Sequence, residues 1–80
     1  MTVTIKLGSG NNQITLSYFD TLTSGSGSDT VVLTGTVSGS VIDLGAGADN
    51  LTLADGGNTI TVSNTETIIG GSGADIVTLG

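Results

Sequence analysis

A short repeat runs through the whole sequence and constrains its fold more than any other feature. Apolar residues recur as apolar-x-apolar triplets, each of which ends a unit of about nine residues. Because side chains alternate between the two faces of a strand, each triplet predicts a short strand with two residues facing a core and the middle residue facing outward. The triplets are Ile5/Leu7, Ile14/Leu16, Val31/Leu33, Ile42/Leu44, Leu51/Leu53, Ile60/Val62 and Val77/Leu79.

Glycine-rich segments separate the triplets and suit turns, because glycine adopts positive φ and permits close backbone approach. Less regular segments at 17–24, 34–44 and 63–70 fill the gaps, and the second of these is longer, which suggests a bulge. No proline and no helical periodicity interrupts the pattern. The glycine-rich segments are 8–12, 25–29, 45–49, 54–58 and 71–75.

Short strands joined by glycine turns at a regular interval predict an all-β fold, a parallel β-solenoid or β-roll without helices. With two units per coil, residues 1–80 make a single domain of about four coils. Solenoids ordinarily carry polar caps, whereas here a strand pattern reaches both ends of the sequence, so each terminal strand is expected to have a free edge.

Composition excludes several classes of function. Seven acidic residues against one base, Lys6, give a net charge of −6, which disfavours nucleic acid and anionic membranes as partners. Without cysteine or histidine the chain has neither disulfides nor a Cys/His zinc site, but oxygen-liganded cations remain compatible. No segment is apolar enough over a sufficient length for membrane insertion, and residues 1–7 lack the features of a cleavable export signal.

Catalysis is not expected from this sequence. It has no His, Cys or Arg, and the single Lys6 has no evident activating partner. No helix is expected after any glycine-rich loop, so these loops do not predict a phosphate site. We therefore predict neither an enzyme nor a small-molecule substrate.

The repeat resembles the hemolysin-type, or RTX, family of calcium-binding proteins, whose nonapeptide is G-G-x-G-x-D-x-U-x. Residues 70–78 match every fixed position, and residues 24–32 and 44–52 match all but the leading glycine. The units at 7–15 and 53–61 carry Asn12 and Asn58 in place of the aspartate.

The resemblance implies that Ca²⁺ is held between turns one coil apart, by carboxylates and by main-chain carbonyls near the glycines. On this register Asn12, Asp29 and Asp49 share one edge, while Asn58 and Asp75 share the other. The units at 17–24 and 63–70 lack the motif, so the row of ions is expected to be incomplete. The expected ligand residues are Asn12, Gly25, Gly27, Asp29, Gly45, Gly47, Asp49, Asp55, Asn58, Gly71, Gly73 and Asp75.

Electrostatics gives an independent reason to expect a cation. Carboxylates stacked about 4.8 Å apart repel by roughly 3–4 kcal/mol per pair at an effective dielectric of 20. Ca²⁺ accepts six to eight oxygens in loose geometry, which glycine loops can supply, whereas Mg²⁺ requires a stricter octahedron.

These features predict a secreted, calcium-stabilised structural subunit whose copies stack head to tail into an extracellular filament or surface layer, exported by a leaderless type I route. One alternative is a calcium-triggered folding module of a larger secreted toxin, enzyme, adhesin or S-layer protein. Another is an ice-binding solenoid, although the outward threonines are interrupted. Asp20 and Asp43 are expected to be solvating charges. The roles of Glu66 and of the Tyr18–Phe19 pair, which suits either core packing or a lateral contact, remain open.

Overall fold

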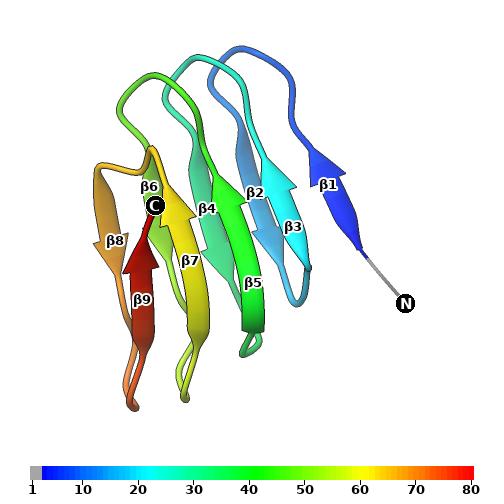
Figure 1. Cartoon of the computed structure of the whole chain (residues 1–80). Helices are drawn as coiled ribbons and strands as arrows, with labels where there is room; N and C mark the ends of the chain where they lie inside the picture. The colour runs from blue at the N-terminus through cyan, green and yellow to red at the C-terminus, as the bar shows by residue number, and fades with distance from the viewer. Residues whose placement is uncertain (1–2) are drawn as a thin grey trace.

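A computed structural model describes residues 3–80, which form a parallel β-solenoid of about four turns (Figure 1). Within these residues no helix is long and apolar enough to cross a membrane. The strands are β1 (Thr4–Lys6), β2 (Gln13–Leu16), β3 (Thr21–Thr23), β4 (Thr30–Leu33), β5 (Ser38–Asp43), β6 (Asn50–Thr52), β7 (Thr59–Ser63), β8 (Thr67–Ile69) and β9 (Ile76–Leu79).

The strands form two sheets, which we call the odd sheet and the even sheet. The odd sheet has the order β1-β3-β5-β7-β9, and the even sheet has the order β2-β4-β6-β8. All neighbouring strands are parallel, because the chain changes sheet at every turn and returns one coil later (Figure 1). The predicted parallel β-solenoid is therefore confirmed.

The register between coils keeps the apolar triplets of the even sheet above one another, whereas in the odd sheet Ile42 pairs with Val62, so those triplets are offset by two residues. Ile14 pairs with Val31 and Val31 with Leu51, so inward-facing positions form continuous rows along the solenoid. The longer segment at 34–44 is accommodated by a register shift between Ser38 and Ser40, which confirms the expected bulge.

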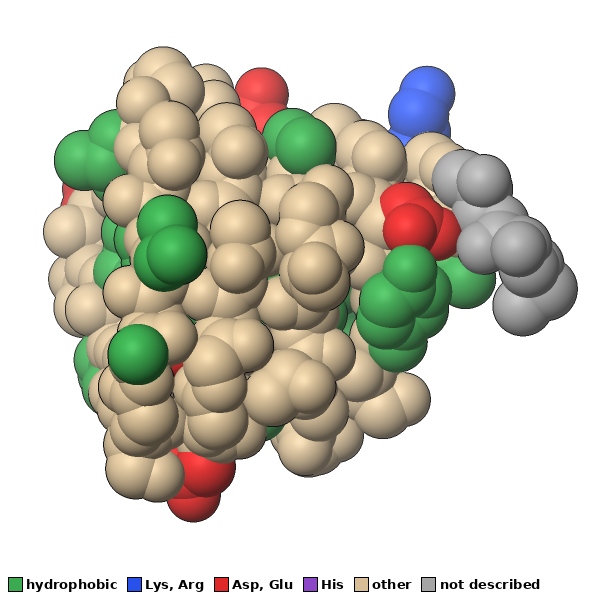
Figure 2. Space-filling view, turned by 60° about the horizontal axis from the view of Figure 1, so that its bottom comes forward, with side chains coloured by type: hydrophobic (Ala, Val, Ile, Leu, Met, Phe, Trp, Pro, Cys, Tyr) green, Lys and Arg blue, Asp and Glu red, His purple; other side chains and the backbone are tan. Residues whose placement is uncertain are grey.

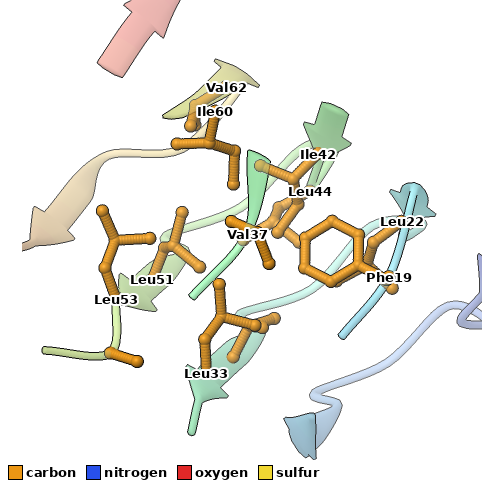
Figure 3. Close-up of a cluster of buried hydrophobic side chains, with 12 residues drawn as sticks. Phe19, Leu22, Leu33, Val37, Ile42, Leu44, Leu51, Leu53, Ile60 and Val62 are labelled. Atoms are coloured by element: carbon orange, nitrogen blue, oxygen red, sulfur yellow. The ribbon is translucent and has the colours of Figure 1, made fainter. Parts of the chain in front are cut away.

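The space between the sheets is filled by apolar side chains (Figure 3). The triplets of the central coils supply most of this core, as predicted, whereas those of the first and last coils are only partly covered. The fully buried hydrophobic residues are Phe19, Leu22, Val31, Leu33, Val37, Ile42, Leu44, Leu51, Leu53, Ala54, Ile60 and Val62.

Five of these core residues lie in turns rather than strands, namely Phe19, Val37, Leu44, Leu53 and Ala54. Phe19 packs beside Leu22 in the core, while the neighbouring Tyr18 is exposed (Figure 3). Of the two roles left open for this aromatic pair, Phe19 takes the core role, because its short turn directs it between the sheets.

The outward faces carry mixed polar rows. One row of the odd sheet aligns Thr21, Val41 and Thr61, and the next aligns Thr23 with Asp43. The face in Figure 2 accordingly shows scattered hydrophobic and acidic side chains among polar ones. Threonine rows are interrupted on the folded sheet as they are in the sequence.

Close contact between stacked turns requires glycine at one repeated position. The third residue of each glycine-rich segment has a φ of 104° at Gly10 and Gly27, 106° at Gly47, 108° at Gly56 and 97° at Gly73. A Cβ added to Gly47 would collide with the carbonyl oxygen of Gly27, whereas one added to Gly10 would meet nothing within 4 Å. Backbone conformation and stacking therefore impose separate demands on this glycine.

Substituting Gly10 and Gly47 separates the cost of the positive φ from the cost of the close contact. We expect Gly10→Ala to lower the free energy of unfolding by about 1–2 kcal/mol, because alanine disfavours positive φ. Gly47→Ala should cost about 1–3 kcal/mol more, because its Cβ also displaces the neighbouring coil. Urea denaturation measures both, and Gly8→Ala, which has open space and no positive φ, is the control. Equal losses for the two variants would contradict the stacking argument.

Candidate metal centre in the turn stacks

The turns form two rows, one along each edge of the solenoid (Figure 1). The first turn stack leads from the odd to the even sheet and comprises 7–12, 24–29, 44–49 and 64–66, at the top of Figure 1. The second turn stack leads back and comprises 17–20, 34–37, 53–58 and 70–75. The structure thereby brings Asn12, Asp29 and Asp49 to one edge and Asn58 and Asp75 to the other, as the sequence indicated.

In the first turn stack, the last residue of each turn binds the backbone of the preceding coil. The amide of Asn12 donates to Oδ1 of Asp29 at 3.0 Å, and the amide of Asp29 donates to Oδ1 of Asp49 at 2.8 Å. The amide of Asp49 in turn donates to Oε1 of Glu66 at 2.7 Å. Each side chain therefore joins two coils at a point where the strand ladders have not yet begun.

The second turn stack repeats this arrangement with one interruption. The amide of Val37 donates to Oδ1 of Asn58, and the amide of Asn58 donates to Oδ1 of Asp75, both at 3.0 Å. The amide of Val3 donates to Oδ2 of Asp20 at 2.6 Å. Val37 offers no side-chain acceptor to the coil before it, so the row is broken there. Asp20 is thus a specific acceptor as well as a charge, which the sequence reading missed.

The side chains of Asn12 and Asn58 donate hydrogen bonds to backbone carbonyls of their own turns. Nδ2 of Asn12 donates to the carbonyl oxygens of Gly8 at 2.6 Å and Gly10 at 3.2 Å, and to Oδ1 of Asp29 at 2.9 Å. Nδ2 of Asn58 makes the corresponding contacts with Ala54 and Gly56, at 2.8 and 3.3 Å. It also donates to Asp75 at 2.8 Å. In these turns the side-chain amide hydrogens thus point at backbone carbonyl and carboxylate oxygens.

The aspartates at the same position cannot do this, because a carboxylate has no hydrogen to donate. In Asp29 the second oxygen, Oδ2, accepts a hydrogen bond from the hydroxyl of Ser24 at 2.8 Å. In Asp49, which is 1% exposed, Oδ2 has no hydrogen-bond partner within residues 3–80. A buried, unpartnered carboxylate oxygen is costly unless something else satisfies it.

The pKa values of Asp29 and Asp49 are shifted in opposite directions by this difference in hydrogen bonding. Burial raises the pKa of Asp49, and the nearby charge of Asp29 adds to that effect. Burial also opposes ionisation of Asp29, but hydrogen bonds from Ser24 and Asn12 outweigh it and lower the pKa of Asp29. Near the other edge, the hydroxyl of Tyr18 donates to Asp20 and lowers the pKa of that carboxyl.

The other predicted ligand residues lie in the same turns. Oδ1 of Asp55, an exposed residue, accepts a hydrogen bond from the amide of Ser72 at 3.0 Å, so Asp55 joins the last two long turns of the second stack. Asp75 is half-buried at the end of the last of these. The predicted glycines Gly25, Gly27, Gly45, Gly47, Gly71 and Gly73 all lie in the long turns, within 3.2 Å of a neighbouring coil when a Cβ is added.

Glu66 belongs to the first turn stack although it follows no glycine motif, and the sequence reading left its role open. It ends a short turn and accepts the amide of Asp49, which is the role that aspartate has in the longer turns. A longer side chain at the end of a shortened turn is the signal that could have identified it.

The donor set in this region suits an oxygen-binding cation. No three carboxylates converge on one point within residues 3–80, so any ion would rely on main-chain carbonyls as well as one or two side chains. The turn that ends at Asp49 shares one positive-φ glycine, Gly47, with the Asn12 and Asn58 turns, but it also has a φ of 72° at Gly45 and lacks their amide hydrogens. The unpartnered Oδ2 of Asp49 beside such a turn fits Ca²⁺, which prefers carboxylate and carbonyl oxygens.

Comparisons with models of protein families, with curated proteins and with solved structures each found no match.

Replacing Asp49 by asparagine tests whether this turn lacks a positive partner. We expect Asp49→Asn to raise the free energy of unfolding by about 1–3 kcal/mol in EGTA, because its amide can donate to the turn carbonyls as Asn12 and Asn58 do. Urea denaturation at neutral pH measures the change. Asp43→Asn removes the same charge from a half-buried residue of β5 and serves as the control, because an asparagine oxygen can keep the bonds that Oδ1 of Asp43 accepts from the amide of Gly45 at 3.0 Å and from Nδ2 of Asn64 at 2.8 Å. A destabilised Asp49→Asn variant would contradict this interpretation.

The pH dependence of the two buried aspartates should have opposite signs. The pKa of Asp49 is raised, so ionisation costs the folded state free energy, and the protein should lose stability relative to Asp49→Asn as pH rises from 3.8 through the raised pKa. The pKa of Asp29 is lowered, so its contribution is present above 3.8 and is lost as pH falls through the lowered pKa. Denaturation of the protein, Asp49→Asn and Asp29→Asn in EGTA across the acidic range measures both differences, and the same sign for both would refute the assignment.

Proposed function

We propose that this chain is a secreted, calcium-stabilised structural subunit whose copies stack end to end into an extracellular filament or surface layer. The observation that carries the proposal is that the terminal coils leave inward-facing apolar side chains and strand edges uncovered. At the last coil, inward-facing Leu79 is 72% exposed, although its register partner Val62 is 1% exposed. A further coil would cover Leu79 as β9 covers Val62.

Both ends of the solenoid present the same kind of surface. β1 and β9 each have one neighbouring strand in the odd sheet, and β2 and β8 each have one in the even sheet. Parallel strands with free edges bind further strands through main-chain hydrogen bonds. A contact between unlike ends does not close on itself, so repeated addition produces a filament rather than a defined oligomer.

Calcium would act on the first turn stack. Asp29 and Asp49 are buried one coil apart, and the only basic side chain, Lys6, lies in β1 and not in a turn. Hydrogen bonds stabilise the charge of Asp29, whereas positive charge beside the unpartnered Oδ2 of Asp49 would come from outside the chain. When bound there, Ca²⁺ would supply that charge and link the turns, with Asp49 and the turn carbonyls as its ligands. The millimolar calcium outside cells suits the modest affinity of such sites.

The resemblance to RTX repeats supports secretion by a leaderless type I route. It also supports a second function, in which this solenoid is a calcium-triggered folding module of a larger secreted toxin, enzyme, adhesin or S-layer protein. Further coils of the same polypeptide would cover Leu79 just as effectively as a second copy. Further G-x-G-x-D units in the reading frame beyond these residues would favour this second function.

The decisive experiment compares the purified chain in millimolar Ca²⁺ and in EGTA. We expect Ca²⁺ to raise the melting temperature by several degrees, since each site adds about 2.7 kcal/mol at 100 times its dissociation constant. Circular dichroism measures melting, and electron microscopy with sedimentation velocity measures assembly. Asp49→Asn should show a smaller calcium shift, with Asp43→Asn as the matched control. Identical melting with and without Ca²⁺ excludes the calcium role, and monomers at high concentration exclude the filament.

A further inference from the structure

The strand count of this solenoid determines how a second copy would fit onto it. Within residues 3–80, nine strands at two per coil leave the odd sheet one strand longer than the even sheet. The next free position after β9 is therefore in the even sheet, next to β8. The two ends lie at opposite extremes of the stack, so one copy can dock on another along the solenoid axis (Figure 1).

We propose that successive copies are related by a half-turn about the solenoid axis, so that β1 of one copy pairs with β8 of the previous copy, and β2 pairs with β9. This inference rests on the proposed end-to-end assembly. Without the half-turn, β1 would follow β9 in the odd sheet and leave the even sheet with a missing strand. With the half-turn, both sheets continue without a gap.

Turn lengths agree with this arrangement. In the second turn stack, the short turns 17–20 and 34–37 are followed by the long turns 53–58 and 70–75. The half-turn places the next copy's long turn 7–12 directly after 70–75. Long turns then follow long turns across the junction, whereas direct stacking would leave an empty turn position between 64–66 and the next copy's 7–12.

Unused hydrogen-bonding groups at the two ends are also complementary. Within residues 3–80, the amide of Asp75 has no hydrogen-bond acceptor and Oδ1 of Asn12 has no donor. The half-turn brings these two groups into the relation that Asn58 has with Asp75, where a backbone amide donates to the side chain of the next coil at 3.0 Å. Each junction would therefore add one more member to the row of side-chain links.

The apolar ends match in the same register. Inward-facing Ile68, Val77 and Leu79 at one end would meet inward-facing Ile5, Ile14 and Leu16 of the next copy. These residues all pack partly against the core or, for Leu79, lie exposed above it. Stacking in this register repeats the internal pairs, in which Ile14 lies on Val31 and Leu16 on Leu33.

Cysteine pairs test the half-turn directly, because the chain has no native cysteine. Thr78 and Thr15 are exposed, outward-facing residues of β9 and β2, and the half-turn makes them register partners on adjacent strands. Adjacent strands lie about 4.8 Å apart, which suits a disulfide. We expect the double variant T78C/T15C to form a ladder of covalent multimers on oxidation in Ca²⁺. T78C/T4C, the pair that direct stacking would join in the register of the odd sheet, should remain largely uncrosslinked.

Filament geometry gives a second readout that needs no substitution. Half-turn stacking adds four and a half coils per copy, so the subunit rise should be about 22 Å at roughly 4.8 Å per coil. Direct stacking would give about 24 Å and no half-turn. Helical analysis of electron micrographs distinguishes the two.

The outcomes separate this inference from the proposed function. Filaments that cross-link through T78C/T4C, or equally through both pairs, would overturn the half-turn while leaving end-to-end assembly intact. Absence of any assembly of the unsubstituted chain in Ca²⁺ would overturn both. Multimers through T78C/T15C alone, with a rise of about 22 Å and a half-turn between subunits, would establish the junction described here.

Discussion

The structure depends on one repeated interaction, in which the side chain that ends each turn accepts a hydrogen bond from the backbone of the preceding coil. Strand ladders hold neighbouring coils together along the sheets, but at the turns the peptide groups change direction and lose their regular partners. Asp29, Asp49 and Asn58 replace those partners while being almost fully buried. Burying a polar side chain is favourable here because its oxygen meets an amide that would otherwise have none.

The same position carries either an amide or a carboxylate, and this choice sets the electrostatics of the turn. Both supply the acceptor oxygen that the preceding coil needs. Only Asn12 and Asn58 also donate to the carbonyls of their own turn. The buried Oδ2 of Asp49 has no hydrogen-bond partner among the described residues. The long turns therefore share a positive-φ glycine and differ in charge, which localises any requirement for a cation to the aspartate turns.

Much of this arrangement could be predicted from the sequence, because the relevant signals are periodic. The alternation in Val31/Leu33 and Leu51/Leu53 indicated which residues face the core, and the repeated glycines indicated which segments turn. Together they were sufficient to predict a parallel solenoid and to place Asp29 above Asp49. The bulge in the segment 34–44 was also visible, because that unit is longer than its neighbours.

The residues that sequence reasoning missed lie where a turn departs from the repeat. Phe19 and Val37 fill the core from short turns that have no glycine motif, and Glu66 ends a short turn of the first stack. Their roles depend on which turn each one is stacked upon, which is a property of the coil and not of the local sequence. The mixture of long and short turns makes the two edges of the solenoid unequal, and under the proposed end-to-end assembly it favours one orientation of the next copy. The irregular turns would thereby determine how one copy is aligned on the next, which identical turns could not do.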